Sequence, residues 1–366
     1  MVTAIRSLRL SHFRSHKSVR LDIDARPVAF YGPNGAGKTN ALEAVSLLSP
    51  GRGLRRGSAQ DMSRLPEAVG WKITADLETS GGRREVETWS HEGAARQVRL
   101  DGKPISQVAL GALIRVLWLV PAMDRLWIEG ADGRRRFLDR TALSFVPAHA
   151  DASLRYEKAM RQRNRLLKDM VRDDAWYAAL EAQMASAAAD IQANRRLALS
   201  RLQEAQAQAE TAFPTAELSL VTPEGDFPEE VDAFAQALAM GRPRDLAAGR
   251  CLIGPHRVDL DAVYAMKGIT ARACSTGEQK ALLVSVILAN ARALASDLGE
   301  PPLLLLDEVA AHLDAQRRAA LYDEIAALGA QAWMTGTDAS LFEALGPRAQ
   351  YFSVSDGADG TEVRAE

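Results

Sequence analysis

Hydrophobic and polar residues alternate over short distances in the first third of the chain. Apolar runs at 4–10, 19–23 and 28–31 predict β-strands. Residues 69–100 alternate with a period of two between short turns, which predicts an antiparallel meander, and 114–120 predicts a further buried strand. The N-terminal part is therefore expected to be rich in sheet.

A long helical segment follows. From about 130 to 212 the chain is rich in Ala, Arg, Gln and Glu, with apolar residues at helical spacing. A connection containing Pro is expected at 214–228, and a linker at 241–244. The helices expected in this segment are 133–143, 149–170, 174–210 and 229–240.

Helices and strands alternate in the C-terminal part, from about 252 onward, and residues after 356 are expected to be frayed. The helices expected here are 277–298, 315–327 and 340–345, and the strands are 303–306, 331–334 and 349–354. We therefore expect residues 1–120 and 245–366 to form one α/β domain, with 121–244 as a helical lobe inserted into it.

The composition is that of a soluble globular protein. The 366 residues are 47% hydrophobic and 25% charged, and the net charge of −2 gives no sign of a nucleic-acid partner. Cys251 and Cys274 lack zinc-site spacing, which favours buried free thiols in a reducing compartment. With no signal sequence and no apolar stretch near the length of a membrane span, we expect a cytoplasmic protein without a membrane partner.

The residues after the third strand fit the P-loop pattern G-x-x-x-x-G-K-[ST], and a helix predicted at 40–48 follows them. Glycines let backbone N–H groups wrap a phosphate, and the helix N-terminus adds its positive dipole end. We predict that Lys38 reaches the β- and γ-phosphates of a nucleotide and that the Thr39 hydroxyl coordinates Mg²⁺. The predicted phosphate loop comprises Gly32, Pro33, Asn34, Gly35, Ala36, Gly37, Lys38 and Thr39.

A second motif is the apolar run 303–306, which predicts a central buried strand that ends in Asp307 and Glu308. Open parallel sheets bind ligands at this end of their strands. In P-loop ATPases an Asp here holds Mg²⁺ together with the P-loop hydroxyl, and a following Glu can deprotonate the attacking water. We predict these roles for Asp307 and Glu308; the alternative is an acidic strand end that caps the next helix.

A third motif begins the helix expected at 277–298. Ser275 and Glu278 form an S-x-x-E capping box, and either they only cap the helix or Ser275 and Gly277 also face a phosphate. Its position before Asp307 resembles that of the signature sequence of ATP-binding-cassette ATPases, and 311–314 resembles their D-loop. The resemblance implies a cassette-type ATPase head with mixed sheets, in which Ser275, Gly277 and Asp314 contact ATP held by a second copy.

The long interval between Lys38 and Ser275, which holds the helical lobe, resembles the SMC-like branch of these ATPases and, within it, the RecF family. The resemblance spans roughly residues 5–340. In that branch the segment equivalent to 8–16 approaches the nucleotide, which implies a nucleotide contact for Arg14. The similar stretches are 8–16, 47–55, 134–140, 254–257 and 275–280.

The resemblance also implies a function: an ATP-dependent homodimer that clamps DNA at single-strand gaps in recombinational repair. Replication restart and SOS induction, with RecR and RecO as partners, belong to the same implication. Two departures predict slow hydrolysis and a weak DNA-stimulated ATPase, because 120–124 lacks the expected Gln and 335–338 lacks the switch histidine. A transporter subunit and an SMC-like scaffold remain as alternatives, although the inserted lobe disfavours the first and the short arm the second.

Three basic clusters are candidates for contact with DNA phosphates, independent of sequence; a solvated face is the alternative for each. The first follows the P-loop helix, and the other two lie in the helical segment. The clusters are Arg52, Arg55 and Arg56; Arg134, Arg135, Arg136 and Arg140; and Arg161, Arg163, Arg165 and Lys168.

Overall fold

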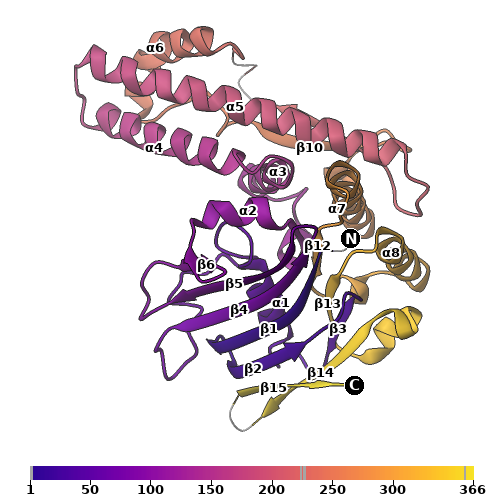
Figure 1. Cartoon of the computed structure of the whole chain (residues 1–366). Coiled ribbons are helices and arrows are strands. Elements are labelled where there is room, and N and C mark those ends of the chain that lie inside the picture. Colours follow the sequence, from indigo (N-terminus) through magenta and orange to yellow (C-terminus); the bar gives the residue numbers. More distant parts are fainter. Residues whose placement is uncertain (1–2, 223–224, 226–227, 358–359) are drawn as a thin grey trace. The chain divides into compact units, whose positions relative to one another are not determined.

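The computed structural model describes residues 3–222, 225, 228–357 and 360–366 (Figure 1). The chain forms two compact units, each assembled from segments distant in sequence. The head unit comprises Met1–Asp124, Ala205–Thr215 and Ser275–Glu366. The helical unit comprises Arg125–Glu204 and Ala216–Cys274.

The first sheet of the head unit is largely parallel, so the carboxyl ends of its central strands lie at the same edge of the sheet. Its order is β15-β14-β3-β13-β12-β8, and only β15 runs antiparallel to its neighbour. All four residues of β12 are buried, as expected for a strand covered on both faces. The strands are β3 (Val28–Tyr31), β8 (Val116–Leu119), β12 (Leu303–Leu306), β13 (Ala332–Gly336), β14 (Gln350–Gly357) and β15 (Gly360–Ala365).

The second sheet of the head unit is the predicted antiparallel meander, extended by the first two strands. Its order is β2-β1-β4-β5-β6-β7. Side chains of β1, β3, β4, β12 and the P-loop helix α1 (Lys38–Ser46) share one hydrophobic core. The strands are β1 (Ala4–Phe13), β2 (His16–Asp22), β4 (Trp71–Thr79), β5 (Gly82–Ser90), β6 (Gln97–Leu100) and β7 (Lys103–Pro104).

The longest helix wholly within the head unit is α7 (Thr276–Leu298), which begins at a complete capping box and ends at Gly299 in the left-handed conformation. It is long and apolar enough to cross a membrane, which the sequence pattern did not indicate, but 72% of its apolar window is buried, as in the core helix of a soluble protein. The other helices of this unit are η1 (Gln107–Ala109), α2 (Leu110–Leu113), η2 (Pro121–Met123), η4 (Ala310–His312), α8 (Ala315–Leu328) and η5 (Ala339–Arg348).

The helical unit packs its helices around a separate apolar core and carries a small antiparallel sheet of order β11-β10-β9. At its centre the fully buried Arg163 donates to Glu181 Oε1 at 3.0 Å and to Asp245 Oδ2 at 2.6 Å. Its helices are α3 (Ala131–Phe145), α4 (His149–Lys168), α5 (Asp174–Ala207), α6 (Val231–Ala248) and η3 (Ala271–Ala273). Its strands are β9 (Ala216–Val221), β10 (Asp259–Tyr264) and β11 (Ile269–Thr270).

Three features differ from the sequence expectation. The helical lobe was expected to end at 244, but the helical unit extends to Cys274. The reason is that β10 pairs with β9, a strand that lies within the connection expected at 214–228. The expected linker at 241–244 lies inside α6, which accommodates Pro243. Residues 360–365 of the tail expected to be frayed form β15, which pairs with β14 from Gly357↔Gly360 to Phe352↔Ala365, whereas 358–359 lie outside the described residues.

Candidate nucleotide and magnesium site

Close packing explains why glycine occupies two positions of the P-loop. Gly32 and Gly37 have φ angles of 145° and 102°, in the region that side chains disfavour. A Cβ on Gly32 would collide with the backbone carbonyl of Val354, and a Cβ on Gly37 with the hydroxyls of Ser15 and Thr361. The turn between β3 and α1 is therefore fixed on both sides by other segments of the head unit.

Lys38 turns back along the loop that precedes it. Its Nζ donates to the carbonyl oxygens of Gly32 at 2.7 Å and of Pro33 at 2.8 Å, and the residue is 5% exposed. Burial lowers the pKa of the Lys38 ammonium, while Glu308 and Asp307 oppose that shift. No side chain caps the first turn of α1 and no acid lies in it, so its N–H groups suit an anion.

The end of β12 meets the start of α1 at the Asp307 carboxylate. The Thr39 hydroxyl donates to Asp307 Oδ1 at 2.8 Å, and the Thr335 hydroxyl donates to the same oxygen at 2.7 Å. The backbone N–H of Glu308 donates to Thr335 Oγ1 at 2.9 Å, and Glu308 itself has a φ of +54°. The sequence therefore identified Thr39 and Asp307 as neighbours, but not the residue that joins them to Glu308.

The donor set of this site fits Mg²⁺. Asp307 and Thr39 offer a carboxylate and a hydroxyl in direct contact, and Mg²⁺ in nucleotide sites is held by one or two such oxygens together with phosphates. Within the described residues no group of three or more His, Cys, Asp or Glu side chains could hold a metal by themselves. A site completed by phosphate oxygens is consistent with that observation.

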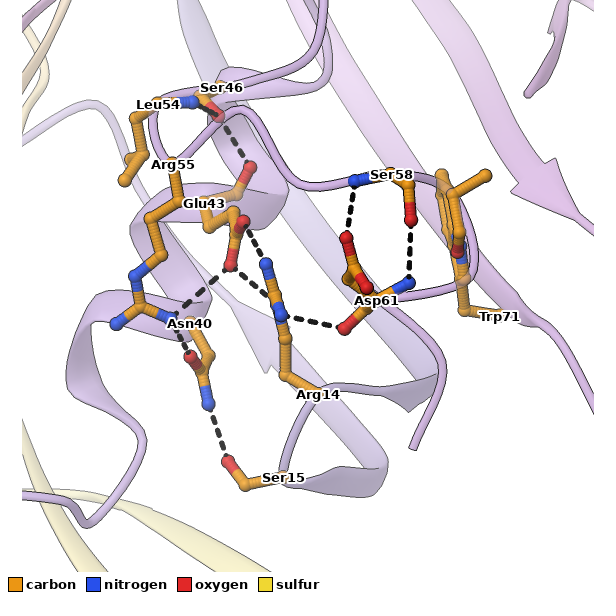
Figure 2. Close-up of polar contacts among 11 residues, drawn as sticks. Arg14, Ser15, Asn40, Glu43, Ser46, Leu54, Arg55, Ser58, Asp61 and Trp71 are labelled. Carbon is orange, nitrogen blue, oxygen red and sulfur yellow. Dashed lines mark hydrogen bonds and ion pairs between the residues drawn. The ribbon is translucent and has the colours of Figure 1, made fainter. Parts of the chain in front are cut away.

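Figure 2 shows a buried carboxylate, Glu43, on α1 between two arginines. Arg14 donates to it twice, from Nε at 2.9 Å and from Nη2 at 2.7 Å, and Arg55 Nη1 lies 3.4 Å from it. Arg14 also donates to the Asp61 carbonyl at 2.6 Å, so three of its bonds are internal. The contact of Arg14 with a nucleotide stays a prediction, whereas its role in holding the turn after β1 against α1 is visible.

The same helix is joined to the turn before β2 by a chain of polar contacts. Arg55 Nη1 donates to Asn40 Oδ1 at 2.6 Å, and Asn40 donates to Ser15 Oγ at 2.7 Å. Ser15 in turn accepts from the Thr361 hydroxyl at 2.6 Å. Burial lowers the pKa of His16 to about 4, so the ring is neutral at pH 7.

The residues of the predicted signature and D-loop lie on the surface of the head unit. Ser275 and Gly277 are exposed, and Ser275 Oγ and backbone N–H both donate to Glu278 Oε2 at 2.8 Å. Asp314 caps α8 by accepting from the Arg317 N–H at 2.8 Å. Among the described residues no hydrogen bond or ion pair joins Ser275, Gly277 or Asp314 to the P-loop of the same chain.

Some of the arginines that are candidates for DNA contact are exposed, and others are buried or held in ion pairs. Arg52, Arg55 and Arg56 are exposed, as is Arg136, while Arg135 pairs with Asp132. Arg134 donates to both oxygens of Asp259, at 2.9 and 2.7 Å, and to two carbonyls, which leaves one N–H for other contacts. Arg163, a candidate for DNA contact, is fully buried and is therefore not available for one, and the ion pair of Arg134 with Asp259 gives that side chain a structural role.

Solved structures share the fold of this chain. The head of an Smc protein of Pyrococcus furiosus aligns with a TM-score of 0.57 and 16% identity, over 100% of this chain and 96% of that chain. A structure described as the recombination mediator protein RecF with ATP aligns with a TM-score of 0.87 and 22% identity, over 100% and 98%. A family model for an AAA domain matches residues 7–101. The fold is that of a P-loop ATPase head with a helical insertion.

Relatives of closer sequence identify the family. The DNA replication and repair protein RecF of Rhizobium rhizogenes is 48% identical over 364 residues, which is 96% of this chain and 97% of the relative. The protein of the same description from Agrobacterium fabrum is 48% identical over 366 residues, 96% of each chain. The chain belongs to the RecF family of DNA replication and repair proteins.

Proposed function

We propose that this chain binds ATP and Mg²⁺ in its head unit and that ATP controls its hold on DNA during recombinational repair. The observation that carries the proposal is the 2.8 Å bond from the Thr39 hydroxyl to Asp307 Oδ1, which joins the P-loop helix to the end of β12. A P-loop alone is a phosphate site. With the acidic strand end in contact, it is a site for a phosphate chain and its metal.

The chemistry follows from the residues at this edge of the sheet. The backbone of Gly32–Thr39 binds the phosphates, and Lys38 neutralises their charge. Thr39 and Asp307 would hold Mg²⁺, which would stabilise the negative charge on the phosphate oxygens. Glu308 accepts a proton from the attacking water. Hydrolysis is slow because the switch histidine and the expected Gln, which order the water and the γ-phosphate in related ATPases, are absent from 335–338 and 120–124.

A second copy completes the site. Ser275, Gly277 and Asp314 are exposed, and within the described residues no hydrogen bond or ion pair joins them to the P-loop of their own chain. In an ATP-bound homodimer they face the nucleotide of the partner copy, so two ATP molecules join two chains. ATP binding thereby closes the dimer, and hydrolysis opens it.

DNA lies against exposed arginines and is held through its phosphates. Arg52, Arg55 and Arg56 form the first contact surface, because they follow the P-loop helix and Arg55 is bonded to Asn40 on that helix. Arg136, which is exposed, forms a second, with the half-buried Arg135 beside it on α3. In this role the protein acts at single-strand gaps in the bacterial cytoplasm, with RecR and RecO as partners, and supports replication restart and SOS induction.

Sedimentation velocity with gapped duplex DNA tests the proposal. We expect a monomer without nucleotide and a DNA-bound dimer with ATP and Mg²⁺. Lys38→Met should stay monomeric under both conditions, and Glu308→Gln should give a dimer that outlasts the wild-type dimer after dilution into ATP-free buffer. An ATP-dependent dimer of Lys38→Met, or a Glu308→Gln dimer that dissociates at the wild-type rate, would show the mechanism to be wrong.

A further inference from the structure

Thr335 lies between the two strands that carry the nucleotide site. The strand order β3-β13-β12 places β13 centrally, and Thr335 pairs with Phe30 in β3. The last pair between β13 and β12 is Met334↔Leu306, so Thr335 stands one position further, level with Asp307. The residue is 0% exposed.

The Thr335 hydroxyl has both kinds of hydrogen bond available to it, and both are used. It donates its one proton to Asp307 Oδ1 at 2.7 Å and accepts the N–H of Glu308 at 2.9 Å. Thr39 donates to the same carboxylate oxygen at 2.8 Å. One oxygen atom therefore links the residue predicted to hold the metal with the backbone of the residue predicted to act as base.

The bond to the Glu308 N–H holds a backbone conformation that is otherwise disfavoured. Glu308 has a φ of +54°, in the left-handed region that non-glycine residues seldom adopt. An acceptor buried beside it can fix that conformation, and a β-branched side chain has few rotamers through which to move away. The direction of the Glu308 carboxylate depends on this backbone conformation.

We infer that Thr335 is a positioning residue for ATP hydrolysis, whose hydroxyl sets the conformation of Glu308 relative to Asp307. The inference rests on the proposed function, in which Glu308 is the catalytic base. Thr335 stands at the point where related ATPases continue toward a switch histidine, which this chain lacks in 335–338. The conformation of Glu308 at the end of β12 is then held by a buried hydroxyl, where related ATPases have an imidazole nearby.

Thr335→Val removes the hydroxyl while preserving the shape of the side chain, and Thr335→Ser keeps the hydroxyl. A matched control is Thr88→Val, because Thr88 is also 0% exposed and its hydroxyl likewise donates once, to the Gln97 carbonyl at 3.0 Å, and accepts once, from Arg96 Nε at 2.8 Å. The control therefore reports the cost of losing a buried hydroxyl away from the site.

Two measurements on the full chain separate positioning from general stability. The first is amide hydrogen exchange at Glu308 without nucleotide, where we expect Thr335→Val to exchange at least about tenfold faster than wild type, as for loss of one hydrogen bond. The second is steady-state ATPase activity with DNA: we expect Thr335→Val to lower kcat about tenfold or more, with the Kd for ATP within about threefold. Thr335→Ser should restore both quantities, and Thr88→Val should alter neither.

The outcomes are distinguishable. Unchanged exchange at Glu308 in Thr335→Val, an unchanged kcat, or a Thr335→Ser variant as impaired as Thr335→Val would overturn the inference. If instead wild type and Glu308→Gln hydrolyse ATP at the same rate, the proposed function fails. Even if the proposed function fails, faster amide exchange at Glu308 in Thr335→Val would show that Thr335 holds the backbone conformation of Glu308. Unchanged exchange would refute that structural role as well.

Discussion

Removing the carboxylate of Glu43 should destabilise the head unit more than any exposed charge change. Glu43 is fully buried and receives two hydrogen bonds from Arg14, at 2.9 and 2.7 Å, with Arg55 Nη1 at 3.4 Å (Figure 2). In Glu43→Ala the Arg14 guanidinium keeps only its bond to the Asp61 carbonyl. Its charge then remains beside α1 without its buried counter-charge, although it still interacts with the exposed Asp61 carboxylate.

The expected magnitude follows from the burial of each partner. Breaking a buried ion pair by removing one member costs about 3–5 kcal/mol. The Arg14 side chain is 21% exposed, so water recovers part of that cost, and we expect a loss of about 3 kcal/mol in the free energy of unfolding. For a unit of this size that corresponds to a fall in Tm of about 6–12 °C. Replacing both charges, in Arg14→Met with Glu43→Leu, should recover most of the loss, because apolar pairs often substitute for buried ion pairs.

Urea unfolding followed by circular dichroism measures these differences. Asp22→Ala is the matched control, because Asp22 and Arg20 form a pair at 3.1 Å whose side chains are 68% and 67% exposed. Exposed pairs contribute about 0–1 kcal/mol, so this control should stay close to wild type. A Glu43→Ala variant no less stable than Asp22→Ala would refute the reasoning. So would a double variant that loses as much stability as Arg14→Met and Glu43→Leu lose together when each is measured alone.

Three further predictions concern the helical unit and the basic surface. Arg163→Leu should lower the free energy of unfolding by about 3–5 kcal/mol in urea titrations, because it leaves the buried Asp245 carboxylate without its cation, whereas Glu181 keeps its ion pair with Arg242. Burial lowers the pKa of His256 from 6.5 to about 4, so the unfolded chain binds more protons than the folded chain between these pH values. The contribution of His256 to stability is therefore complete above about pH 6.5 and is lost as the pH falls toward 4. His256→Gln should reduce this pH dependence in urea titrations. Arg52→Gln should weaken DNA binding equally for all sequences and lower the salt slope by about one, measured by fluorescence anisotropy, whereas Arg20→Gln should not.

The parts of the fold that the sequence predicted well are those with a strong local pattern. The strand at 303–306 has the predicted bounds because four consecutive leucines must be buried on both faces of a sheet. The P-loop turn and Asp307 follow buried strands as predicted, because their spacing and their strand contexts are specific. Their roles toward a nucleotide and a metal stay predictions. Their contact through Thr39 follows from parallel strands that end at a common edge.

Long-range pairing explains what the sequence could not show. β9 and β10 are separated by α6, and the sequence of neither strand indicates that it pairs with the other. For the same reason the domain boundary was placed at 245 rather than at 275. Arg163 looked like part of a basic surface because its neighbours are charged, whereas its two acidic partners come from α5 and α6. Charge in sequence does not reveal burial.

Thr361 shows why the predicted frayed tail belongs to the site. Its backbone N–H donates to the Ser15 carbonyl at 3.2 Å and its hydroxyl to Ser15 Oγ at 2.6 Å, and both hydroxyls pack against Gly37. Asn40 donates to the same Ser15 hydroxyl at 2.7 Å. A glycine-rich loop is flexible by itself, so the turn predicted to bind phosphate acquires a fixed shape because the first hairpin and the last strand pack against it. The motif specifies the chemistry of the site, and residues more than three hundred positions further along the chain specify its geometry.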